Sequence, residues 1–117
     1  MNIQRIPASS AGRSKTVTYG GLAYTVVTAN NDSASIIEQT QCALGYLDLH
    51  LQEVNSDKTR ILQATVYLKD MKAKEQMDQV WCDWIGPKEN WPQRACVGAD
   101  LAGNDLIEIV VTATTCD

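Results

Sequence analysis

Apolar residues recur at helical spacing in two stretches of the chain and alternate with polar residues in most of the others. In the first helical stretch, residues 33–54, one face consists of Ile36, Thr40, Ala43, Leu44, Leu47, Leu51 and Val54. Ser35 and Glu38 form the S-x-x-E pattern of a capping box near its start. The pattern therefore predicts a long amphipathic helix over residues 33–54.

A second helix is predicted after Asp70, whose side chain can cap it. Its apolar stripe consists of Ala73, Met77, Val80, Trp81 and Trp84. Gly86 and Pro87 end the pattern, because glycine favours the left-handed conformation after a helix and proline cannot continue one.

The remaining segments read as β-strands. A short one is predicted in NIQRI near the N-terminus, and two more in residues 15–28, where Gly20 and Gly21 suit a tight hairpin turn. Residues 59–70 alternate, and two further strands are predicted at about residues 91–99 and 106–113, joined by the loop DLAGND. The order β-β-β-α-β-α-β-β indicates an α+β fold with one sheet covered on one side by two helices.

Strand alternation assigns side chains to the two faces of this sheet. The face toward the helices is predicted to hold Leu62, Ala64, Val66, Leu68, Ala95, Val97, Ala99, Ile107, Ile109 and Val111. The opposite face is predicted to hold Ile61, Gln63, Thr65, Tyr67, Arg94, Cys96, Gly98, Leu106, Glu108, Val110 and Thr112. This second face is too apolar for a plain solvent surface, which favours contact with another subunit, and it brings Arg94 and Glu108 onto one surface.

Composition narrows the class of protein. A length of 117 residues fits one domain, residues 1–117, with 44% hydrophobic and 21% charged residues as in ordinary globular proteins. The net charge of −4 and the lack of a Lys/Arg run in the sequence argue against a nucleic-acid or membrane partner. The N-terminal sequence lacks the apolar segment of a signal peptide, so we expect a soluble, cytoplasmic protein.

The four cysteines are scattered, with no C-x-x-C pair and a single histidine to complete a metal site. We therefore expect no metal, and free thiols rather than disulfides.

Three segments resemble a known family: ILQATVYLKDM, the aromatic-Pro-x-Arg-x-Cys-Val of WPQRACV, and LIEIVVTA near the C-terminus. They occur in the order and spacing of the Rid (YjgF-like) family of reactive intermediate imine deaminases, and the similarity covers nearly the whole chain. The hairpin segment GRSKTVTYGGLAYTV looks like that of a shorter-armed branch of this family.

This resemblance implies a chorismate-mutase-like fold, a homotrimer and ligand clefts between neighbouring subunits. It implies hydrolysis of 2-aminoacrylate and related 2-imino acids to 2-keto acids and ammonia, without a cofactor. Arg94 would bind the substrate carboxylate, for which a planar guanidinium is well suited, and the backbone near Cys96 would touch the reacting group. Glu108 would orient the attacking water and shuttle a proton.

Two further residues are candidates for substrate binding: Arg13 in the N-terminal loop and Trp91 beside the arginine motif. The chain departs from the family's well-characterised deaminases in two places. Its N-terminal loop lacks their tyrosine, and Val26 and Val27 stand where they carry Ser-Gly.

Other interpretations remain open at this point. Considered without the resemblance, Arg94 is an ordinary solvated or ion-paired residue, with Glu108 or Asp100 of a neighbouring chain as its partner. A non-enzymatic trimer that binds a small carboxylate metabolite or a partner protein is the main alternative function. A chorismate-mutase-like pericyclic enzyme, with Arg13, Arg60 and Arg94 as its cationic cluster, is a third.

Overall fold

The structure is a computed structural model that describes residues 2–116. The strands are β1 (Gln4–Pro7), β2 (Ser14–Tyr19), β3 (Leu22–Thr28), β4 (Ile61–Leu68), β5 (Gln93–Gly98) and β6 (Ile107–Thr114). The helices are α1 (Ile36–Gln52) and α2 (Lys74–Ile85), with single 3-10 turns at Lys58–Arg60, Met71–Ala73 and Lys88–Asn90. The predicted α+β fold and element order are thus confirmed.

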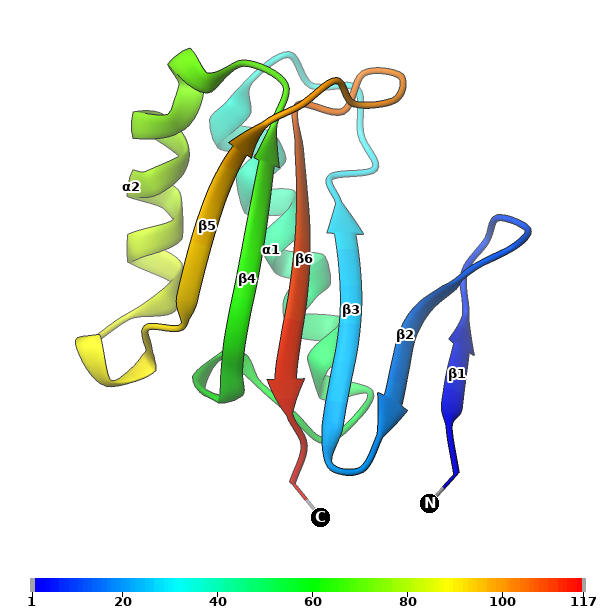
Figure 1. Cartoon of the computed structure of the whole chain (residues 1–117). Coiled ribbons are helices and arrows are strands. Elements are labelled where there is room, and N and C mark those ends of the chain that lie inside the picture. Colours follow the sequence, from blue (N-terminus) through cyan, green and yellow to red (C-terminus); the bar gives the residue numbers. More distant parts are fainter. Residues whose placement is uncertain (1, 117) are drawn as a thin grey trace.

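All six strands form one mixed sheet in the order β1-β2-β3-β6-β4-β5. Only the β4–β5 pair is parallel, because α2 carries the chain back between these two strands. Both helices lie on one side of the sheet, with α2 over the β5 edge, as Figure 1 shows. Within the described residues, no helix is long and apolar enough to cross a membrane.

Local signals set the ends of the elements as predicted. Gly20 and Gly21 both have positive φ, 60° and 82°, which gives the two-residue turn between β2 and β3. Ser35 caps α1 by accepting a hydrogen bond from the backbone N–H of Glu38 at 3.2 Å. Asp70 caps the 3-10 turn that leads into α2, and Gly86 ends α2 with a φ of 81°.

The core lies between the helices and the covered face of the sheet. It joins residues of both helices to β3, β4 and β6, and its members include Val27, Ala43, Leu44, Leu47, Leu51, Ala64, Val66, Leu68, Met77, Trp81, Ile85, Ile107, Ile109 and Val111. The predicted covered face of β6 and most of that of β4 are therefore confirmed.

The face prediction for the start of β4 was wrong. Ile61 is buried, at 5% exposure, whereas Leu62 is 51% exposed. The register of β4 against β6 shifts between Ile61 and Gln63, so an irregularity inserts one residue and reverses the alternation at this point.

The face prediction for β5 was also wrong. Arg94, Cys96 and Gly98 pair in parallel register with Ala64, Val66 and Leu68, all of which are buried beneath the helices. Paired residues of neighbouring strands point to the same side of a sheet. A Cβ added to Gly98 would lie 2.9 Å from Cγ of Met71, on the helix side. Small apolar residues therefore occupy the open face, and the polar arginine lies under α2.

Candidate functional site

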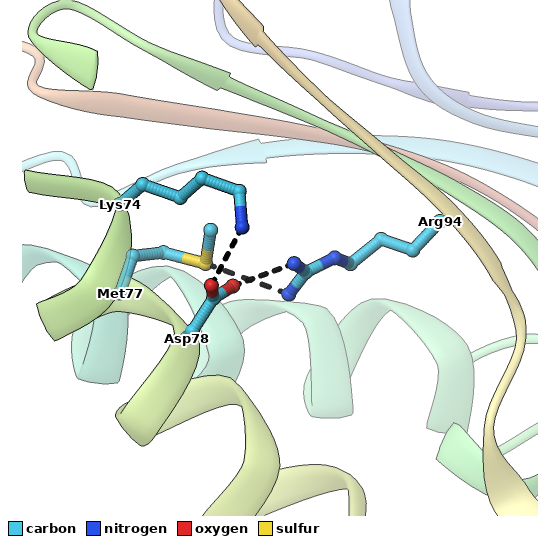
Figure 2. A network of polar contacts seen from close by, with 4 residues as sticks. All are labelled: Lys74, Met77, Asp78 and Arg94. Carbon is cyan, nitrogen blue, oxygen red and sulfur yellow. Dashed lines mark hydrogen bonds and ion pairs between the residues drawn. The ribbon is translucent and has the colours of Figure 1, made fainter.

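The Arg94 side chain extends from β5 beneath α2, and Figure 2 shows its guanidinium group directed at Met77 and Asp78 of that helix. Nη2 donates to Oδ1 of Asp78 at 2.5 Å, and Cζ lies 5.2 Å from the centroid of the Trp81 ring. Nη1 lies 3.8 Å from Sδ of Met77. With 19% of its side chain exposed, Arg94 is a fixed, partly desolvated cation rather than a solvated one.

Asp78 connects Arg94 to a second cation, because Nζ of Lys74 lies 2.7 Å from its other carboxylate oxygen. Burial raises the pKa of Asp78, but the hydrogen bonds from Lys74 and Arg94 outweigh this effect and bring the pKa below its ordinary value. Asp78 is therefore ionised at neutral pH. The ion-paired reading of Arg94 is correct, but its partner is Asp78 rather than Glu108.

The guanidinium retains donors for a ligand. It carries five N–H groups, and the described residues provide acceptors for Nη1 and Nη2 only. A carboxylate that approaches the part of the guanidinium not occupied by Asp78 can accept hydrogen bonds from the remaining N–H groups, while Asp78 and the Trp81 ring hold the group in place.

Cys96 follows Arg94 along β5, on the same side of the sheet, and is partly buried against the core. Burial raises the pKa of its thiol, and this outweighs the lowering effect of Arg94 and Lys74. The thiol is thus protonated at neutral pH, which does not favour a nucleophile.

Glu108 lies near the start of β6, between Thr28 of β3 and Tyr67 of β4. Its neighbours Ile107 and Ile109 are fully buried beneath the helices, so alternation directs Glu108 to the open face, as predicted. Within residues 2–116 it forms no ion pair.

Arg94 and Glu108 do not share a surface within one chain, contrary to the sequence-based prediction. Arg94 lies on the helix side of the sheet and Glu108 on the open side. Arg94 is level with Ala64 of β4, whereas Glu108 is level with Tyr67, three residues farther along that strand. That offset amounts to roughly 10 Å.

Arg13 and Trp91 lie at opposite edges of the sheet. Arg13 is exposed in the loop between β1 and β2, whereas Trp91 immediately precedes β5, close in sequence to Arg94. The Trp91 side chain is 59% exposed, and its indole N–H donates to the backbone oxygen of Gly86 at 3.0 Å. Trp91 thus offers an exposed aromatic surface three residues before Arg94 in the sequence, whereas Arg13 lies at the opposite edge of the sheet.

Sequence reasoning missed Asp78 and Lys74, and it assigned Trp81 to the core alone. The i, i+4 spacing of Lys74 and Asp78 was a visible signal for a pair on one helix face. The side of α2 that faces Arg94 could not be predicted once β5 had been assigned the wrong face.

In residues 2–116, no group of three His, Cys, Asp or Glu side chains could hold a metal ion. A surface hollow of about 460 Å³ runs along α2 and is lined by Glu75, Asp78, Gln79, Cys82 and Asp83. Asp78 therefore borders both this hollow and the guanidinium of Arg94.

Comparison with known proteins relates this chain to a family. The profile of the endoribonuclease L-PSP family matches residues 6–115. A RutC family protein from Haemophilus ducreyi is 41% identical over 102 residues, which is 86% of each chain. The RutC family protein YoaB from Escherichia coli is 34% identical over 114 residues, or 97% of this chain and 98% of YoaB.

Solved structures agree with the sequence comparison. The crystal structure of a YjgF family member from Neisseria meningitidis has a TM-score of 0.91 and 34% identity, and the match covers 100% of this chain and 98% of that one. A putative translation initiation inhibitor from Salmonella typhimurium has a TM-score of 0.86 and 30% identity, with 97% of each chain covered. The chain therefore belongs to the endoribonuclease L-PSP family, the Rid/YjgF-like family that its sequence motifs resemble.

Proposed function

We propose that this protein hydrolyses 2-aminoacrylate and related 2-imino acids to 2-keto acids and ammonia. The observation that carries the proposal is the guanidinium of Arg94, which is fixed by Asp78 and the Trp81 ring and still has N–H donors for a carboxylate. It occurs in the motif on which the family resemblance rests.

The proposed reaction needs little beyond positioning. The enamine takes a proton at its terminal carbon to become the imine, water adds to the C=N carbon, and the resulting carbinolamine expels ammonia to leave the keto acid. Arg94 binds the carboxylate, and Glu108 orients the water and transfers its proton. One such acid-base group contributes on the order of 100-fold to 10,000-fold in rate.

The proposed active unit is a homotrimer with clefts between subunits. Arg94 and Glu108 lie on opposite faces of one sheet, so a cleft that uses both takes them from two chains. The open face supplies a suitable contact surface, because apolar side chains on it are between 41% and 51% exposed: Tyr24, Leu62, Val97 and Val110. In such an assembly, Arg13 of a neighbouring chain can approach the substrate as well.

The family description names an endoribonuclease, but imine hydrolysis fits the chemistry of this chain better. RNA binding draws on many cationic side chains that neutralise phosphates. The chain carries a net charge of −4, and Arg94 and Lys74 share a carboxylate in the site. A small monoanion matches this arrangement more closely than a polyanion does.

A coupled assay tests the proposal. A pyridoxal-phosphate dehydratase generates 2-aminoacrylate from serine, and imine decay is followed with wild-type protein, with Arg94→Ala and without protein. We expect wild-type protein to accelerate decay and Arg94→Ala to lose most of this acceleration, because the carboxylate loses its bidentate partner. Arg5→Ala, at an exposed arginine of β1, is the matched control and should behave like wild type.

Decay at the spontaneous rate with wild-type protein, across several imino acids, would reject the deaminase. Saturable binding of pyruvate that is lost in Arg94→Ala, without turnover, would instead support the non-enzymatic carboxylate binder.

A further inference from the structure

The cationic site at Arg94 contains a carboxylate of its own. Asp78 accepts from Nη2 of Arg94 at 2.5 Å through one oxygen and lies 2.7 Å from Nζ of Lys74 through the other. Two cations and one anion leave a single positive charge unmatched. The charge of this group is therefore balanced by one incoming carboxylate and not by two.

More negative charge lies nearby on α2. The hollow bordered by Asp78 is also lined by Glu75 and Asp83. A ligand held by Arg94 whose far end extends along this surface meets carboxylates rather than cations. Glu75 and Asp83 are exposed, so their repulsion of a carboxylate at that end is weaker than that of the half-buried Asp78, because water screens exposed charges more strongly.

We propose that Asp78 determines the substrate class of the site, positioning Arg94 for one carboxylate and disfavouring 2-imino acids whose side chain carries a second. This inference rests on the proposed function. It assigns two effects to one residue: the hydrogen bond to Nη2 fixes the guanidinium, and the negative charge discriminates between monoanionic and dianionic ligands. Asp78 acts through Arg94 and is a positioning residue rather than a catalytic one.

Asp78→Asn separates the two effects. The amide oxygen can still accept from Nη2 of Arg94, so the guanidinium keeps its position, while the negative charge is removed. Asp78→Ala removes both the acceptor and the charge. Asp83→Asn is the matched control, because it removes the same charge from the same hollow at a residue that makes no hydrogen bond to Arg94.

The experiment compares two ligands of equal chain length, 2-oxopentanoate with one carboxylate and 2-oxoglutarate with two. Calorimetric titration gives the Kd of each for wild type and the three variants, and deaminase turnover is measured in parallel. We expect wild type to prefer the monocarboxylate and Asp78→Asn to reduce this preference about fivefold. Asp83→Asn should change it less, and Asp78→Ala should weaken binding of both ligands.

The outcomes distinguish this inference from the function on which it rests. Turnover of 2-aminoacrylate together with an unchanged preference in Asp78→Asn overturns the role of Asp78 and leaves the deaminase standing. Absence of both turnover and ligand binding in wild type overturns the two together. A preference for the monocarboxylate that decreases in Asp78→Asn, and that added salt does not restore, supports the inference. Salt screens the charges that remain and cannot replace the charge that was removed.

Discussion

At the scale of single residues, the structure shows which contacts hold the Arg94 guanidinium in place. The resemblance of WPQRACV to the Rid family implied that Arg94 would bind a carboxylate. The structure adds what holds it: Asp78, the face of Trp81 and the sulfur of Met77. An anchored guanidinium loses less entropy on binding a ligand than a free arginine does. The contacts thus hold the guanidinium in one orientation, as the proposed binding of a carboxylate requires.

The substitution Cys96→Ala tests whether the thiol takes part in the proposed reaction. Because burial raises its pKa, the thiol is protonated at neutral pH and is a poor nucleophile. We expect Cys96→Ala to keep the rate of 2-aminoacrylate hydrolysis within about threefold of wild type. We also expect iodoacetamide to alkylate Cys96 slowly, which mass spectrometry of the treated protein measures. A complete loss of turnover in a folded Cys96→Ala protein would contradict this reading.

At the scale of elements, periodicity predicted both helices and most strands, because each has one buried face. The termini followed from local chemistry, as Ser35, the Gly20-Gly21 pair and Gly86 show. The predictions of side-chain faces were wrong where the alternation is interrupted, in β4, and in β5, which is an edge strand. The irregularity at Leu62 reverses the predicted faces only at the start of β4, and β5 exposes Val97 while it places Arg94 beneath α2.

The irregularity in β4 makes a prediction about stability. Ile61 is buried and Leu62 is exposed, so the two aliphatic neighbours should respond differently to truncation. Ile61→Ala should lower the free energy of unfolding by about 2–5 kcal/mol through lost burial and a cavity. Leu62→Ala should lower it less, as measured by urea denaturation at equal protein concentration. The reverse order would show that the register shift is misplaced.

A second prediction concerns His50, which ties α1 to the hairpin of β2 and β3. Its Nδ1 lies 2.9 Å from Oγ1 of Thr25, which in turn donates to the backbone oxygen of Lys15. Burial lowers the pKa of His50, Lys15 lowers it further, and Glu53 opposes this. The folded state therefore resists protonation of the ring.

The sign of the pH effect follows from this lowered pKa. The stability contributed by neutral His50 is present above its ordinary value of 6.5 and is lost as the pH falls from there through the folded-state pKa. Wild type should lose stability between about pH 7.5 and about pH 5.5, and His50→Asn should lose less. Thermal unfolding at both pH values measures this. If both proteins lose the same stability between the two pH values, His50 is not the cause of the pH dependence.

At the scale of the whole molecule, the sheet separates the two residues of the proposed reaction. Arg94 lies on the helix side at the β5 edge, and Glu108 lies on the open side of β6. The exposed apolar residues of that open face fit contact with a second copy of the chain. The proposed function therefore predicts that assembly is required for activity and does not only add stability.

Mixing two inactive variants tests this arrangement. Arg94→Ala keeps Glu108, and Glu108→Gln keeps Arg94, so a cleft between the two kinds of subunit can contain both native residues. Equal amounts that are unfolded and reassembled together should recover about a quarter of the wild-type rate, as random mixing of subunits predicts. Each variant reassembled alone should stay inactive. Native mass spectrometry verifies that mixed oligomers have formed. If these oligomers recover no activity, each site takes both residues from the same subunit.

By itself, the sequence determined the element order, the covered faces of α1 and β6, the turns, and the motif that contains Arg94. These follow from local propensity and from the period of the apolar residues, which act over a few positions. Only the tertiary structure decided which side of the sheet Arg94 lies on, that Asp78 is its partner, and that Glu108 lies beyond its reach in the same chain. Those facts depend on strand register and on the packing of α2 against an edge strand, both set by contacts between residues distant in the sequence.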